Sequence, residues 1–162
     1  ADYMIDVMDR ELLGYFNSKS GDKFPPFTPP MAGIWGPKVM VINERAGSGG
    51  DFLPYAFREL GIGTLLGTRT WGGLIGIFAN PPLIDGGTMT VPHFRFVDAD
   101  NNWSVENEGV APDIEVKLDP IATNEDRDTQ LEAAIEEILE QLETYEDDVP
   151  REQPPLPTEL GH

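Results

Sequence analysis

The sequence lacks cysteine, long apolar runs and a balancing number of basic side chains. With no cysteine among its 162 residues, the chain can have neither a disulfide framework nor thiolate metal ligands. No segment approaches the roughly 18–20 consecutive apolar residues of a transmembrane helix. Only 11 Lys and Arg oppose 29 Asp and Glu, and the resulting net charge of −18 is repelled by nucleic acids and anionic membranes. We therefore expect no nucleic-acid and no membrane partner.

What is present is the composition of an ordinary globular domain. Hydrophobic residues make up 40% of the chain and charged residues 25%, and the length suits one domain with a sizeable core. The net charge is −13 over residues 111–162 but only −5 over residues 1–110, which indicates a solvated face and a polar tail. Because Ala1 already belongs to a helical pattern and no methionine or signal peptide precedes it, we expect the protein to begin further upstream.

The order of the apolar patterns predicts an α/β domain with a mostly parallel sheet. Helical spacing predicts helices over residues 2–13 (ended by Gly14), 51–60 and 128–145. The last of these carries one apolar stripe: Leu131, Ala134, Ile135, Ile138, Leu142 and Tyr145. Short apolar runs predict strands over residues 39–42 and 65–66, and residues 74–97 combine short strands with hairpin turns. The continuous apolar run at residues 39–42 is typical of a strand buried on both faces. Five prolines predict a long surface loop over residues 17–37, and a Pro-rich tail follows Pro150.

A glycine-rich turn between a predicted strand and a predicted helix is the sharpest local feature. Gly47 and Gly49 flank Ser48, and they permit a strained turn that exposes its hydroxyl. The N–H groups of Gly49 and Gly50 lie at the predicted helix start, where they could stabilise an oxyanion. This pattern is typical of a turn that presents a nucleophile. Two other readings stay open: Ser48 as a simple helix cap, and a phosphate-binding nest of backbone N–H groups.

Few residues could assist a nucleophilic serine. His93 lies in a strand-like run and His162 in the tail; we interpret His93 as a structural or surface residue and discount His162. Glu106 and Glu108 lie in a loop after an apolar segment, where exposed carboxylates are the rule. Composition and spacing alone therefore leave the partner of Ser48 open.

Five further observations, taken together and in order, resemble a known family. They are residues 43–51, residues 66–73, residues 83–86, residues 105–107 with 109–113, and the closing helix over 128–142. The first looks like the nucleophile segment of the tricorn core peptidases, a branch of the S41-type serine peptidases that uses a Ser-His-Ser-Glu tetrad. Residues 1–145 thus resemble the C-terminal part of such a catalytic domain, and residues 146–162 are expected to form an extended acidic tail.

The resemblance implies roles for three residues. Ser48 stands at the position of the nucleophile, and Gly49 at the position whose backbone N–H forms half of the oxyanion hole. Glu106 matches the last member of the tetrad, which acts on the catalytic histidine through the second serine. His93 and Glu108 match no catalytic position. In this family the histidine, the second serine and the other oxyanion glycine precede the segment that corresponds to Ala1, so this chain is expected to be inactive by itself.

Two departures from related sequences carry further expectations. In the carboxy-terminal processing peptidases a lysine serves as the base, but Gly73 stands at that position here, which favours the tricorn branch and its histidine. In the archaeal tricorn protease an aspartate that helps select a basic P1 side chain follows a Leu/Ile-Gly-Tyr run. Phe16 follows Leu13-Gly14-Tyr15 in this chain, so we predict Phe16 as a substrate-binding residue and an apolar P1 preference.

The resemblance also implies a ClpP/crotonase-like α/β fold and a peptidase that needs no metal or organic cofactor. Its substrates would be peptides, its assembly a hexameric ring, its downstream partners aminopeptidases and its location the cytoplasm. The main alternative is a catalytically incomplete assembly or peptide-binding module of the same fold. A nucleotide- or CoA-binding role of a crotonase-like domain is a more distant one.

Overall fold

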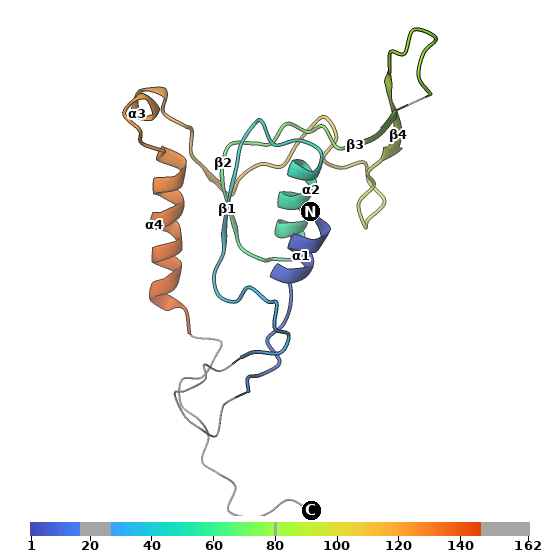
Figure 1. Ribbon diagram of the computed structural model, residues 1–162. Coiled ribbons are helices and arrows are strands. Elements are labelled where there is room, and N and C mark those ends of the chain that lie inside the picture. Colours follow the sequence, from blue (N-terminus) through green and yellow to red (C-terminus); the bar gives the residue numbers. More distant parts are fainter. Residues whose placement is uncertain (17–26, 80, 147–162) are drawn as a thin grey trace, which may run out of the picture.

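The computed structural model describes residues 1–16, 27–79 and 81–146, and these form three layers (Figure 1). The middle layer is a parallel sheet in the order β1-β2-β5. Helix α4 packs on one face of this sheet, and α2 packs on β2 with α1 against it. The elements are α1 (Asp2–Met8), β1 (Val39–Ile42), α2 (Gly49–Glu59), β2 (Thr64–Gly67), β3 (Ile75–Ala79), β4 (Thr90–Arg95), β5 (Ile114–Glu115), α3 (Pro120–Asn124) and α4 (Thr129–Thr144). The predicted α/β class with a parallel sheet is confirmed.

The parallel register brings two loops to one edge of the sheet. Val39 lies opposite Thr64 and Ile42 opposite Gly67, so the turn after β1 and the loop after β2 leave the sheet side by side. The core beneath them consists of buried apolar side chains from the sheet, α2 and one later loop: Ile42, Phe57, Leu65, Val105 and Val110. In open α/β sheets this carboxyl edge is where ligands bind.

Strands β3 and β4 form a separate two-stranded antiparallel ribbon that projects from the body of the molecule (Figure 1). This agrees with the short strands and hairpin turns predicted over residues 74–97. Several large apolar side chains on the ribbon are exposed, among them Ile77, Phe78 and Phe94. The base of the ribbon, at Ile75 and Ile77, reaches the carboxyl edge of the parallel sheet.

The first helix is shorter than predicted. It ends at Met8, although the apolar spacing continues to residue 13. The following segment pairs instead with the chain near residue 28: the Leu13 N–H donates to the Pro29 carbonyl at 3.0 Å, and Phe16 bridges to Phe27. These tertiary backbone bonds replace the intrahelical ones. In the described residues 27–37, the predicted loop contains neither a helix nor a strand; residues 17–26 lie outside the described residues, as does the predicted tail beyond residue 146.

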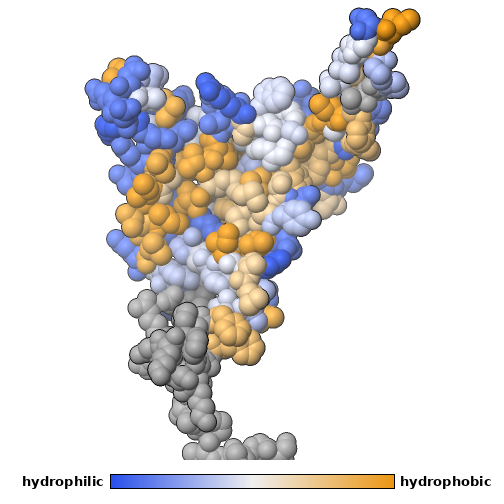
Figure 2. Space-filling model, in the orientation of Figure 1, coloured by the Kyte–Doolittle hydropathy of each residue, from blue (hydrophilic) through white to orange (hydrophobic). Residues whose placement is uncertain are grey.

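The last helix occupies the predicted segment, but its buried face differs from the predicted stripe. Ala134 is buried, whereas Leu131 and Ile135 are about half exposed. Buried Gln130 instead points to the sheet and donates to the Val116 carbonyl at 2.8 Å. Figure 2 shows the resulting apolar surface over α4 and the neighbouring sheet. Similarly, β1 is not buried on both faces, because Val41 in this edge strand remains 43% exposed.

Two short elements were not predicted. Strand β5 has only two residues, too few to show a periodicity. Helix α3 carries a usable signal, since Asp119 caps it by accepting from the Ile121 N–H and Pro120 occupies its first position. Among the described parts of the chain, no helix combines the length and the apolar character needed to cross a bilayer.

Candidate active site

Ser48 lies in a strained turn between β1 and α2. Its backbone has φ 55° and ψ −114°, a conformation that side-chain-bearing residues rarely adopt and that is concentrated at functional sites. The Ser48 N–H donates to the Gly73 carbonyl at 3.0 Å. Although Ser48 occupies the N-cap position of α2, its side chain makes no capping hydrogen bond. The structure therefore contradicts the reading of Ser48 as a helix cap and leaves its hydroxyl available.

The N–H of Gly49, the first residue of α2, has no hydrogen-bond partner among the described residues. A free N–H at the positive end of a helix can stabilise a developing oxyanion. The expectation that Gly50 would serve as a second donor is wrong, because its N–H donates to the Gly47 carbonyl at 2.8 Å. The Asp51 N–H is likewise occupied, by the Ser48 carbonyl at 2.9 Å, which argues against a phosphate nest of several free N–H groups.

Glu106 is held in a second strained turn. Its neighbours Val105 and Asn107 have φ 70° and φ 63°, and a β-branched residue such as valine is an outlier there. Val105 is only 4% exposed and belongs to the core, so its packing offsets the strain and fixes the turn. The Oε2 atom of Glu106 is buried and has no hydrogen-bond partner among the described residues. A buried acceptor without a donor is costly and points to a missing partner group.

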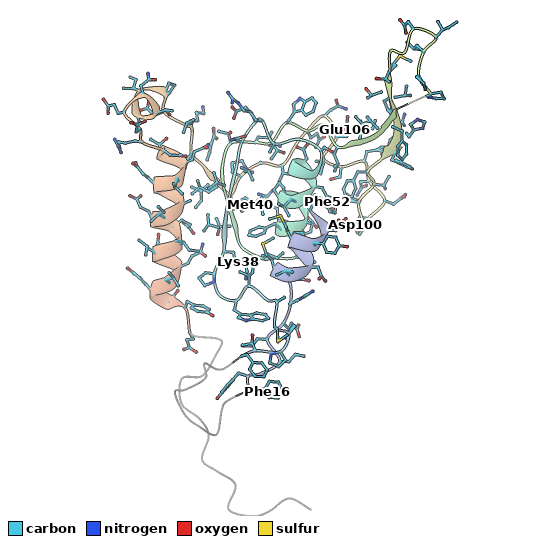
Figure 3. All side chains as sticks on the ribbon, in the orientation of Figure 1. Phe16, Lys38, Met40, Phe52, Asp100 and Glu106 are labelled. Carbon is cyan, nitrogen blue, oxygen red and sulfur yellow. The ribbon has the colours of Figure 1, made fainter. Side chains whose placement is uncertain are left out.

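The two strained turns border one cleft of about 380 Å³ (Glu106 is labelled in Figure 3). Its lining combines polar groups, glycines and three apolar side chains: Ser48, Glu106 and Asn107; Gly72 and Gly73; Trp71, Ile75 and Ile77. Among these lining residues there is neither a histidine nor a lysine. The cleft lining therefore holds a candidate nucleophile and a carboxylate but neither of these bases, and Gly49, the candidate oxyanion donor, directly follows the nucleophile in the chain.

The loop after β2 joins the two turns through backbone contacts. The Trp71 N–H donates to the Ala46 carbonyl at 2.8 Å, and the Asn107 N–H donates to the Gly72 carbonyl at 2.7 Å. Gly72 and Gly109 both have positive φ, and a Cβ atom on Gly72 would lie 2.6 Å from the Gly109 nitrogen. Only glycine permits backbones to approach this closely.

Gly73 lines the same cleft as Ser48. A Cβ atom on Gly73 would lie 2.5 Å from the Trp71 ring. A longer side chain at this position would therefore displace the indole.

The structure does not bring the other predicted residues to the cleft. His93 lies on the β3–β4 ribbon with its ring 5.5 Å from that of Phe78, which agrees with its interpretation as a surface residue. Glu108 is exposed and lies outside the cleft lining. Phe16 stacks on Phe27 at 4.9 Å and lies at the opposite end of the molecule from Glu106 (Figure 3). Phe16 does not line the cleft that contains Ser48, so its role in substrate binding stays a prediction.

Two further carboxylates, Asp51 and Glu44, were not singled out from the sequence. Asp51 is completely buried and bonds to the loop after β2; its place in the first turn of a helix was the available signal. The pKa of Glu44 is lowered by its hydrogen bonds, first from backbone N–H and then from the Thr68 hydroxyl at 2.8 Å. Over the described ranges, no group of three or more His, Asp or Glu residues is placed to hold a metal ion.

Comparison with known proteins places this arrangement in a family. The model of peptidase family S41 matches residues 11–116. The tricorn protease of Thermoplasma volcanium is 44% identical over 91% of this chain, and tricorn protease homolog 1 of Streptomyces coelicolor is 42% identical over 94%. A crystal structure of the tricorn protease superposes with a TM-score of 0.82 at 36% identity over 88% of the chain.

The chain spans only 14% of the length of each of these relatives. The matches nevertheless cover nearly all of its own residues, and the S41 match includes the strained serine turn and the Glu106 turn. The chain therefore belongs to peptidase family S41 and is similar to the tricorn proteases within it.

Proposed function

We propose that the intact protein is a serine peptidase that cleaves peptides through an acyl-enzyme. Ser48 is the nucleophile, Gly49 supplies an oxyanion donor and Glu106 is the last member of a Ser-His-Ser-Glu tetrad. The observation that carries this proposal is the shared cleft: an uncapped serine in a strained turn and a buried, unpaired carboxylate oxygen line the same space. Family membership supports the same reaction class.

The reaction follows from these groups. A histidine removes the proton of Ser48 as its oxygen attacks the peptide carbonyl, and the free N–H of Gly49 stabilises the negative charge that develops on the carbonyl oxygen. Collapse expels the amine, which takes the proton from the histidine, and water then hydrolyses the ester. The cleft lining contains no base, so the histidine and the second serine would come from another part of the intact protein.

The unpaired oxygen of Glu106 fits the contact that the second serine would make. A serine hydroxyl that donates to Oε2 would satisfy the buried acceptor, and its own oxygen could then accept from the histidine. Such an orienting relay fixes the tautomer of the imidazole and stabilises its charged form. The ClpP/crotonase-like form of the α/β fold is part of the same proposal, supported by the serine turn at the carboxyl edge of a parallel sheet.

Covalent labelling of Ser48 tests the proposal. We expect a fluorophosphonate probe to label Ser48 of the full-length protein, as identified by mass spectrometry of the peptide that contains residues 46–58, and to label this chain alone far more slowly. Heat-denatured protein is the control for non-specific reaction. Absence of labelling in a folded, full-length protein would contradict the peptidase and favour the incomplete assembly or peptide-binding module.

An apolar P1 preference is the second expectation. The apolar side chains of Trp71, Ile75 and Ile77 line the cleft and support this preference, whereas Phe16 lies outside that lining. Apolar walls stabilise an apolar substrate side chain by about 1–3 kcal/mol relative to a smaller one. Rates of hydrolysis of fluorogenic peptides ending in Phe, Leu or Arg check this, and a clear preference for Arg would contradict it.

Assembly into a homo-oligomer, expected as a hexameric ring, also belongs to the proposal. It is supported by the exposed apolar side chains on α4 and on the β3–β4 ribbon (Figure 2), because large apolar patches mark interaction sites. Native mass spectrometry of the full-length protein gives the number of subunits, and a monomer at micromolar concentration would contradict it. Aminopeptidases would act on the released peptides.

A further inference from the structure

A fully buried carboxylate outside the proposed tetrad connects the two sides of the cleft. Asp51 lies in the first turn of α2, three residues after Ser48, and its exposed fraction is 0%. Neither nucleophilic attack nor oxyanion stabilisation, as described above, uses its side chain. Because a buried carboxylate persists only with strong hydrogen bonds or a charged partner, its contacts indicate its role.

Both oxygens of Asp51 accept hydrogen bonds from consecutive backbone N–H groups. Oδ1 accepts from Gly72 at 2.8 Å, and Oδ2 accepts from Gly73 at 3.0 Å. A carboxylate acceptor makes such bonds stronger than those between neutral groups. These two bonds hold two consecutive peptide units, Trp71–Gly72 and Gly72–Gly73, and so fix the position and orientation of the Gly72–Gly73 backbone. Among the described residues, no other side chain bonds to the N–H groups of Gly72 and Gly73.

The same two glycines contact both catalytic turns through their carbonyl groups. The Gly73 carbonyl accepts from the Ser48 N–H at 3.0 Å, and the Gly72 carbonyl accepts from the Asn107 N–H at 2.7 Å, one residue beyond Glu106. A shift of the Gly72–Gly73 backbone would therefore move the nucleophile turn and the Glu106 turn relative to each other.

We infer that Asp51 is a positioning residue that sets the relative placement of Ser48 and Glu106 by holding the backbone of Gly72 and Gly73. This inference rests on the proposed function. It assigns Asp51 no contact with the substrate, so its effect falls on the chemical step. A displacement of about 1 Å in the reacting groups can reduce the rate by about 10²-fold.

Two variants of the full-length protein test the inference. Asp51→Asn keeps the size of the side chain but places an NH2 group against a backbone N–H, whereas Asp51→Glu keeps both acceptors and displaces them by one methylene. We expect each variant to lower kcat per active site by about 10²-fold with KM nearly unchanged. Active sites are counted by fluorophosphonate labelling carried to completion, so poorly folding protein does not enter the rate.

Asp113→Asn is the matched control. Asp113 also accepts a backbone N–H, from Leu65 at 2.7 Å, and it pairs with Arg58, but unlike Gly72 and Gly73 neither of these partners lines the cleft. We expect this variant to lose stability while keeping the kcat per active site of the parent protein. Hydrogen exchange over residues 70–74, followed by mass spectrometry, should become faster in Asp51→Asn and remain unchanged in Asp113→Asn.

The outcomes separate the two proposals. If the parent protein cleaves peptides and the Asp51 variants keep its kcat per active site, or lose no more than Asp113→Asn, the positioning role is wrong. If the parent protein neither cleaves peptides nor labels at Ser48, the proposed function fails. The exchange measurement then still shows whether Asp51 holds the loop, and unchanged exchange in Asp51→Asn would overturn that contact as well.

Discussion

Replacing Ser48 by alanine in the full-length protein is expected to lower kcat for peptide hydrolysis by about 10⁴–10⁶-fold, because loss of the nucleophile removes the covalent route altogether. The fold should tolerate the change, since the Ser48 side chain makes no capping hydrogen bond and is exposed. Removing the hydroxyl of an exposed serine also removes little packing, so the free energy of unfolding should change little. KM for the peptide should change little, because the cleft walls remain in place.

Ser104→Ala is the matched control for this prediction. Ser104 lies outside the cleft lining and contributes to the Glu106 turn only through its carbonyl, which accepts from the Glu106 N–H at 2.8 Å. The kcat of Ser104→Ala for peptide hydrolysis should therefore equal that of the parent protein. Steady-state hydrolysis of a fluorogenic peptide measures both variants, and normal turnover by Ser48→Ala would refute the assignment of the nucleophile.

Glu106→Gln has the second largest expected effect, a loss of about 10²–10⁴-fold in kcat. Removal of the orienting carboxylate in other serine peptidases costs about 10⁴-fold, because the histidine then loses its correct tautomer and the stabilisation of its charge. Here the carboxylate acts through a second serine, so the lower part of this range is included. The glutamine has nearly the same volume, and its carbonyl oxygen can still accept one hydrogen bond.

Glu108→Gln is the natural comparison, because it makes the same chemical change two residues away in the same turn. Glu108 is exposed, and its hydrogen bonds among the described residues are made by its backbone: the carbonyl accepts from Arg69 at 3.2 Å and the N–H donates to the Val105 carbonyl at 3.0 Å. We expect its kcat to remain that of the parent protein. Equal losses in the two variants would indicate a general disturbance of the turn and would argue against the relay through Glu106.

Much of the candidate site was accessible from the sequence because its signals are local. A short apolar run, a glycine-rich turn and a helical repeat lie next to one another along the chain, and β1 and α2 form where these patterns predict them. The same adjacency places Ser48 at the start of a helix whatever the rest of the fold does. The family resemblance added Glu106, which no local pattern distinguishes from Glu108.

Other features depended on contacts between distant segments. Helix α1 ends at Met8, and the Leu13 N–H bonds to the Pro29 carbonyl instead of to a helical carbonyl. A helical repeat in the sequence does not reveal a competing hydrogen bond to a distant segment. The face of α4 that meets the sheet contains Gln130, which was not part of the predicted apolar stripe, because the Val116 carbonyl accepts a hydrogen bond from its amide. Helical periodicity shows which residues share one face of a helix. Packing against the neighbouring layer determines which face is buried.

The sequence by itself determined the α/β class, the serine turn and, through composition, the exclusion of disulfides and thiolate metal sites, because each follows from residue types and short-range periodicity. Only the tertiary structure decided that Glu106 has a buried, unpaired oxygen in the cleft that Ser48 lines and that Asp51 accepts hydrogen bonds from the backbone N–H groups of Gly72 and Gly73. The tertiary structure also places Phe16 on Phe27, at the opposite end of the molecule from Glu106. Burial and hydrogen-bond partnership are properties of groups that meet in space, and no pattern along the chain specifies them.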